Sequence, residues 1–87
     1  MHFVYLLRSL SDPSQKYVGF THDIHTRLAA HNEGRSPHTA KFRPWAMVAY
    51  FAFEVECAAL DFEKYLKSGS GRALAEKRLW VQIGDST

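Results

Sequence analysis

Two short apolar runs near the N-terminus are joined by a connection that is too short to hold a helix. The runs cover residues 2–8 and 16–20, and both are rich in the aromatic and branched side chains that favour strands. Parallel strands need a crossover of about a dozen or more residues, which residues 10–15 cannot provide. The sequence therefore predicts an antiparallel hairpin with a central first strand and with Tyr5 beside Tyr17.

The segment after this hairpin changes from strand-like to helix-like. Residues 22–33 are expected to form a helix that Thr21 or Asp23 caps and that Gly34 ends. Gly19, near the end of the second strand, is expected to let the backbone turn. Residues 34–45 contain two prolines and are expected to form an ordered but irregular loop.

The C-terminal half predicts one more strand and two helices. Residues 46–53 form an apolar run, and apolar side chains then repeat at helical spacing through residues 54–67. Ser70 can cap a last helix that reaches about Trp80, and residues 81–87 are expected to be a tail. The predicted fold is α/β (α+β), one domain over residues 1–80, with a small three-stranded, mainly antiparallel sheet flanked by helices in the order ββαβαα.

Composition excludes several classes of protein. The longest uncharged apolar run, residues 46–53, is far shorter than the roughly 20 residues that span a membrane, and the N-terminus has no signal-peptide pattern. Cys57 is the only cysteine, so no intrachain disulfide can form. These features favour an intracellular, cytoplasmic protein, with association with the nucleoid left open.

A net charge of +2 is too small to predict a nucleic-acid partner by itself, but the basic residues are clustered. One cluster lies in the 34–45 segment and another near the C-terminus, and Lys16 precedes Tyr17. Taken singly, such residues are most often solvated surface. Together they predict a rim for a nucleic-acid backbone, made of Lys16, Arg35, His38, Lys41, Arg43, Lys67 and Arg72.

Arg27 and His31 lie four residues apart on the first predicted helix, so both leave the same face. We expect them at the edge of the buried face, close to the sheet yet able to reach solvent. On the later helix, Glu63 falls roughly 80° from the middle of the apolar stripe. Arg27 and Glu63 each have a simpler explanation. Arg27 could form a surface ion pair with Asp23, and Glu63 could form one with Lys67.

These residues occur in the order of a known family. Phe3-Val4-Tyr5 is similar to the first motif of the GIY-YIG nuclease superfamily, and Tyr17-Val18-Gly19 is similar to the second. The Arg27 to His31 spacing, with Asn32 and Gly34 after it, resembles the small single-domain members. Glu63 matches the glutamate of the family's later helix, and residues 67–72 resemble a segment common in such proteins. The resemblance covers the chain to about Trp80.

The resemblance implies a metal-dependent endonuclease that hydrolyses DNA. Glu63 would hold Mg²⁺ or Mn²⁺, Arg27 would balance negative charge on the phosphate, and Tyr5 would be the general base. Tyr17 would orient the attacking water, and His31 would share the proton or hold a phosphate. Arg27, Lys16 and the metal would lower the cost of ionising Tyr5. The substrate would be branched, flapped or single-stranded DNA, with RNA left open, and cutting both strands would need a homodimer or a protein partner.

Two departures from the family pattern leave a second class of function open. Phe3 stands where the first motif has glycine, and Asn32 is the only asparagine, so none follows the helix that carries Glu63. A nucleic-acid-binding module that has kept the fold and lost the reaction is also compatible with these residues. A third class is a zinc site drawn from His22, His25, His31, His38 and Cys57, although no paired cysteines accompany them.

Overall fold

The computed structural model describes residues 1–81, and it contains one three-stranded sheet. Strand β1 (His2–Ser9) lies at its centre, between β2 (Lys16–Thr21) and β3 (Trp45–Phe53). Both pairings are antiparallel, with Tyr5 opposite Gly19 on β2 and opposite Tyr50 on β3. The predicted hairpin, the central first strand and the third strand are all confirmed.

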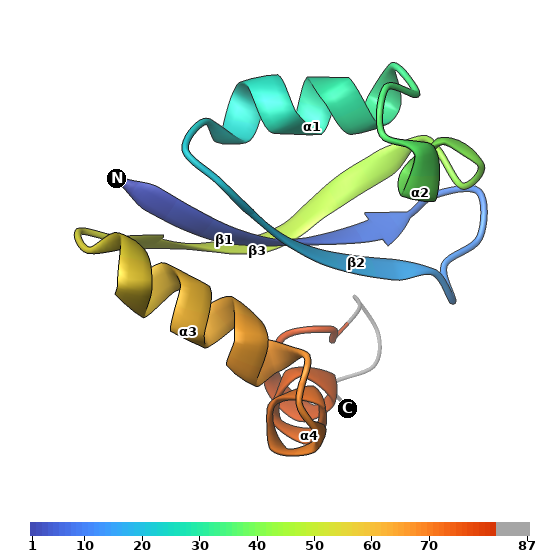
Figure 1. The fold of residues 1–87 in the computed structure, drawn as a ribbon. Helices are drawn as coiled ribbons and strands as arrows, with labels where there is room; N and C mark the ends of the chain where they lie inside the picture. Colours follow the sequence, from blue (N-terminus) through green and yellow to red (C-terminus); the bar gives the residue numbers. More distant parts are fainter. Residues whose placement is uncertain (82–87) are drawn as a thin grey trace.

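Helices cover both faces of the sheet (Figure 1). Helices α1 (Ile24–Asn32) and α2 (Pro37–Ala40) lie on one face, and α3 (Glu56–Leu66) and α4 (Gly69–Arg78) lie on the other. The alternation of side chains along β1 divides the core accordingly. Tyr5 and Leu7 pack with Trp45 and α1. Val4 and Leu6 belong to the cluster on the side of α3 and α4.

The ends of the helices agree with the predictions for α1 and differ for α4. Asp23 caps α1, because its carboxylate accepts hydrogen bonds from the backbone and the hydroxyl of Thr26. Helix α4 is capped by Ser68, whose hydroxyl accepts from the Gly71 N–H, so the predicted cap at Ser70 is wrong. Ser68 and Ser70 are both followed three residues later by an N–H donor, and the sequence alone does not separate them.

The segment between Gly34 and Trp45 is more regular than predicted. It contains the four-residue helix α2, which begins at Pro37, a residue suited to the first turn of a helix. Gly34 has a φ of 79°, the left-handed conformation expected where α1 ends. The Asn32 side chain then joins α1 to β3, accepting from the Trp45 N–H at 2.6 Å and donating to the Trp45 carbonyl at 3.1 Å.

Among residues 1–81, none of the helices has the length and apolar character that a membrane-crossing segment requires. The prediction of a C-terminal tail at residues 81–87 falls almost entirely outside the described residues, which end at Val81.

Candidate active site

The hydroxyl of Tyr5 is the point where side chains from the sheet and from α1 meet. Tyr5 is 1% exposed, and its hydroxyl lies 2.9 Å from His31 Nε2. The Nε–H of Arg27 donates to the same oxygen at 3.2 Å. The helical spacing of Arg27 and His31 places a cation and an imidazole side by side, as the sequence led us to expect, and the structure directs both at the Tyr5 hydroxyl. Within residues 1–81, Arg27 makes this contact rather than the ion pair with Asp23 that was the simpler explanation of its spacing.

Gly19 makes room for this hydroxyl. It lies inside β2, directly opposite Tyr5, and the strand continues to Thr21, so the predicted backbone turn at Gly19 is wrong. A Cβ at position 19 would come within 2.4 Å of the Tyr5 hydroxyl and 2.9 Å of the Tyr17 ring. The absence of a side chain, and not freedom of the backbone, is what this position requires.

The hydrogen bonds continue from Tyr5 through His31 to α2. His31 Nδ1 lies 2.6 Å from the Thr39 hydroxyl, which in turn donates to the Ser36 carbonyl at 3.4 Å. Because Thr39 donates to a carbonyl, its oxygen accepts from His31 Nδ1–H, which leaves Nε2 to accept from Tyr5. This tautomer gives one chain of donors from Arg27 to Ser36.

His31 is fully buried, so the expectation that it reaches solvent is wrong. Burial and the nearby Arg27 charge lower the pKa of His31 from 6.5 to about 4, and the ring is therefore neutral near pH 7. With both ring nitrogens bonded to protein atoms, His31 is placed to share a proton with Tyr5 and has no nitrogen left for a phosphate.

Burial also raises the pKa of Tyr5 above its ordinary value of 10. The hydrogen bond from Arg27 acts in the opposite direction, while the neighbouring Tyr17 and Glu63 add to the increase. The predicted help from Lys16 is not found in this geometry, because Lys16 pairs with Glu76 at 2.8 Å and lies over the Trp80 ring. The same contact stabilises the charged form of Arg27, since its hydrogen bond to Tyr5 raises the pKa of the guanidinium.

Tyr17 and Glu63 are partly exposed, whereas Tyr5 and His31 are buried. The Tyr17 ring lies beside those of Tyr5 and His31, with its centroid 6.1 Å and 4.9 Å from theirs. The Glu63 side chain on α3 is 21% exposed and binds Lys67 Nζ at 3.1 Å, so the surface ion pair expected from the sequence is present. One carboxylate of this kind can hold a largely hydrated magnesium ion, provided that Lys67 gives up its contact.

A cleft of about 530 Å³ opens beside Tyr17, between β2 and the helices α3 and α4. Its walls combine basic side chains with the apolar surfaces of Leu66 and Trp80. Three of the seven predicted nucleic-acid-binding residues line it, namely Lys16, Lys67 and Arg72. The cleft thus joins part of the predicted basic rim to the candidate site.

The other four predicted basic residues belong to the segment that contains α2. All four are exposed, namely Arg35, His38, Lys41 and Arg43. Arg35 pairs with Glu33 at 3.0 Å, and Lys41 lies over the Phe42 ring. They do not line the cleft of Lys16, Lys67 and Arg72, so the predicted rim is divided into two groups.

Comparison with known proteins identifies the family. The family model for the GIY-YIG catalytic domain matches residues 1–78. The chain belongs to the GIY-YIG family. Its relatives include the structure-specific endonuclease subunit SLX1 of Malassezia globosa, 42% identical over 67 residues, and UPF0213 protein YazA of Bacillus subtilis, 30% identical over 82 residues.

These relatives differ in how much of their length is matched. The SLX1 alignment covers 72% of this chain but only 15% of the fungal protein. The alignment with YazA covers 93% of this chain and 78% of the Bacillus subtilis protein. A UPF0213 protein of Bacillus velezensis is 34% identical over 76% of this chain and 66% of its own length. The chain thus spans a small part of the SLX1 subunits and most of the UPF0213 proteins.

The two motifs of the GIY-YIG family face each other in this sheet. Tyr5 of the first motif is opposite Gly19 of the second, and the glycine leaves the space that the tyrosine hydroxyl occupies. Phe3, at the position of the first motif's glycine, instead packs its ring against Tyr50 on β3. That substitution therefore affects the β3 side of β1 and leaves the contact between Tyr5 and Gly19 intact.

Thr39, which fixes His31, was not predicted from the sequence, and neither were the parts of the cleft wall that Glu76 and Trp80 form. A threonine eight residues after a histidine carries no recognisable signal, because the contact depends on how α2 folds back.

The residues of the alternative zinc site do not lie together in the structure. Within residues 1–81, the three-residue metal-ligating group is His2, His22 and Glu56, which shares only His22 with that set.

Proposed function

We propose that this GIY-YIG domain is an endonuclease that hydrolyses phosphodiester bonds in DNA. Its catalytic residues are Tyr5, Tyr17, Arg27, His31 and Glu63. The observation that carries the proposal is the convergence of Arg27 and His31 on the buried hydroxyl of Tyr5, beside a cleft with basic walls. This arrangement supports proton transfer next to a bound phosphate, and it has no evident use in binding alone.

Tyr5 acts as the general base for the attacking water, and hydrogen bonds can hold its ionised form, although burial raises its pKa. In the phenolate state Arg27 Nε–H still donates to the oxygen. Neutral His31 can then adopt its other tautomer, donating from Nε2 and accepting from the Thr39 hydroxyl at Nδ1. The hydrogen bonds that join Tyr5, His31 and Thr39 are thereby kept in both protonation states of Tyr5, while the Thr39 hydroxyl turns from the Ser36 carbonyl to His31.

Tyr17 and Arg27 complete the site on the protein side. Tyr17 lines the cleft and lies against both Tyr5 and His31, so it is placed to orient the water. Arg27 is partly exposed, and its remaining N–H groups can balance the charge that develops on the phosphate. A single site of this kind cuts one strand at a time.

The chemistry of the donor set fits a weakly held divalent metal. Glu63 offers a carboxylate at the edge of the site, and Mg²⁺ or Mn²⁺ is commonly held by one or two carboxylates, waters and substrate oxygens. A metal held there would supply positive charge to a phosphodiester oxygen and to the leaving group. Lys67, released from Glu63, would be free to bind a neighbouring phosphate.

The name of the fungal relatives suggests the form of the substrate. Those proteins are structure-specific endonuclease subunits, and the matched part of this chain corresponds to a fraction of their length. We extend this to branched or flapped DNA as the substrate of this chain, with a homodimer or a protein partner where both strands are cut. Single-stranded DNA and RNA are the comparison substrates.

The ion pair between Glu63 and Lys67 favours one alternative, a DNA-binding module without catalysis. That pair occupies the carboxylate that the metal requires, and the raised pKa of Tyr5 opposes its role as a base. The two functions differ in what Glu63 contributes. It is essential for cleavage in an enzyme and dispensable in a binding module.

The experiment compares the wild type with Glu63→Ala on labelled branched, flapped, single-stranded and duplex DNA, with matched RNA, in Mg²⁺ or Mn²⁺. We expect cleavage by the wild type and none by Glu63→Ala, with DNA affinity retained. Asp61→Ala is the matched control, because Asp61 is an exposed carboxylate on the same helix. Binding without cleavage by the wild type would establish the alternative, and cleavage by both proteins would point to another site.

A further inference from the structure

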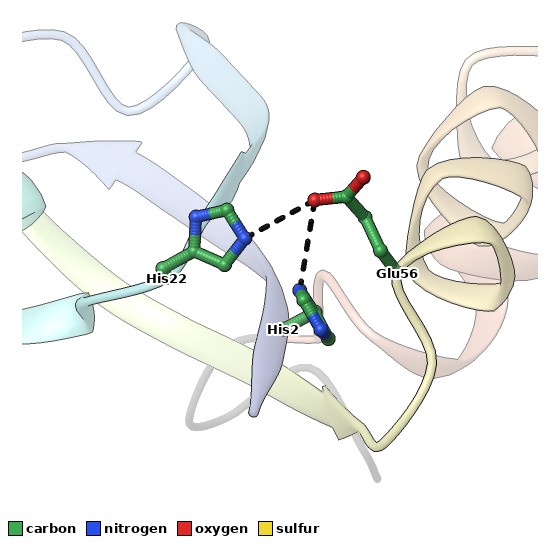
Figure 2. A group of neighbouring side chains, drawn as sticks. All are labelled: His2, His22 and Glu56. Atoms are coloured by element: carbon green, nitrogen blue, oxygen red, sulfur yellow. Dashed lines mark hydrogen bonds and ion pairs between the residues drawn. The ribbon is translucent and has the colours of Figure 1, made fainter.

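Two imidazoles and a carboxylate from three different elements meet on the surface at the start of α3. They are His2 at the start of β1, His22 between β2 and α1, and Glu56 at the first residue of α3. Figure 2 shows both histidines directed at one oxygen of Glu56. His22 Nε2 lies 3.3 Å from Glu56 Oε2, and His2 Nδ1 lies 3.9 Å from the same atom.

The Nδ1 atom of His2 is buried and has no hydrogen-bond partner within residues 1–81. Leaving such a polar atom unpaired is costly, and it lies too far from Glu56 for a normal hydrogen bond. A metal ion between the two side chains would satisfy this nitrogen. The separation of 3.9 Å is therefore better suited to a bridging cation than to a direct contact.

We propose that His2, His22 and Glu56 form a binding site for a divalent transition metal of the zinc class. The three ligand atoms lie within 4.8 Å of one another. In tetrahedral zinc sites with bonds of about 2.0–2.2 Å, neighbouring ligand atoms are about 3.3–3.6 Å apart. The observed separations need only small rotations of side chains to reach this geometry.

The aromatic neighbours hold the two imidazoles in place. His2 stacks on Phe20 with an interplanar angle of 11°, and the rings of Phe20 and His22 meet edge to face. This packing limits the loss of side-chain freedom when a metal binds. The side chains of His22 and Glu56 are 59% and 55% exposed, so a metal can enter and water can complete its coordination.

This site is separate from the proposed catalytic metal. Glu56 and Glu63 are seven residues apart on α3, which puts them on nearly the same face but about 10 Å apart along the axis. Two nitrogens and one oxygen favour zinc-class metals, whereas one carboxylate suits magnesium. A metal at His2, His22 and Glu56 would fasten the start of α3 to β1 and to the segment leading into α1.

The test is metal titration of untagged protein freed of metal by a chelator. We expect Zn²⁺ to bind with one-to-one stoichiometry in competition with a chromophoric chelator, and Co²⁺ to give the visible absorption band of a low-symmetry site. Zn²⁺ should also raise the thermal midpoint. His22→Ala and Glu56→Gln should each weaken binding by at least about tenfold, the lower end of losses from residues that only support a ligand.

Two variants serve as controls. His25→Ala removes an exposed histidine, three residues after His22, that is not a member of the group, and Glu63→Gln removes the proposed magnesium ligand. Both should bind Zn²⁺ as the wild type does. The proposal is overturned if the wild type binds Zn²⁺ no more tightly than the protein with both His22→Ala and Glu56→Gln, or if either control loses the metal. None of these results depends on DNA cleavage.

Discussion

The Tyr5 hydroxyl accepts a hydrogen bond from Arg27 and shares another with His31, while its burial opposes the ionisation that a general base needs. The net effect is a pKa above 10, so the phenol is neutral near pH 7. Forming a phenolate at pH 7.5 from a group of pKa 10 already costs about 3.4 kcal/mol, and the burial of Tyr5 increases this cost. Its ionisation should therefore control the rate of cleavage.

Cleavage should become faster with pH across the range from 7 to 9. Because the phenolate fraction of a group with pKa above 10 grows about tenfold per pH unit there, the single-turnover rate should follow it. Tyr5→Phe should lower the rate at least about 100-fold and remove the pH dependence. Tyr50→Phe, on an exposed tyrosine of β3, is the control. A flat wild-type profile would contradict a tyrosine base.

The space at Gly19 leads to a prediction about stability. Gly19→Ala should lower the free energy of unfolding by about 1–3 kcal/mol, because the new Cβ would overlap the Tyr5 hydroxyl. It should also displace Tyr5 and slow cleavage. Gly69→Ala has nothing within 4 Å of the new Cβ and should not lower stability in urea unfolding. Equal stability of the two variants would show that position 19 has room for a side chain.

At the level of elements, patterns within a segment were predictable and contacts between segments were not. The six-residue connection determined the hairpin, the repeat of apolar side chains predicted α3, and the end signals predicted α1, whose helical spacing places Arg27 and His31 on one face. The partners of His31 could not be predicted, since Thr39 reaches it only because α2 packs on α1. The burial of His31 also depends on contacts between segments, and so could not be predicted. The same holds for the division of the basic rim between the cleft and the α2 segment.

The cap of α4 is a local choice that the structure decides in favour of Ser68. Ser68→Ala should lower the free energy of unfolding by about 1 kcal/mol, because the Gly71 N–H loses its acceptor. Ser70→Ala, two residues later in the first turn of the helix, should change it by less than about 0.5 kcal/mol. Urea unfolding of both variants checks the order, and a larger loss for Ser70→Ala would restore the cap predicted from the sequence.

For the whole molecule, the buried neutral His31 links stability to pH. Its folded pKa of about 4 lies below the ordinary 6.5, so the unfolded chain binds more protons between these values. Stability should therefore fall as the pH decreases from 6.5 to 4, by about 3 kcal/mol from this group. In His31→Gln, which cannot titrate, this part of the decrease should be absent from urea unfolding. The same decrease in both proteins would exclude His31 as its cause.

The two groups of basic residues should differ in how they contribute to DNA binding. If Lys67 and Arg72 contact phosphates in the cleft beside Tyr17, each contact releases about one counterion. Lys67→Ala or Arg72→Ala should then reduce the slope of log affinity against log salt concentration by about 0.9. Lys77→Ala removes an exposed lysine of α4 that does not line the cleft, and it should leave the slope unchanged. Equal slopes for all three variants would place the DNA outside the cleft. The same measurement on Lys41→Ala and Arg43→Ala would then show whether the DNA binds along the segment that contains α2.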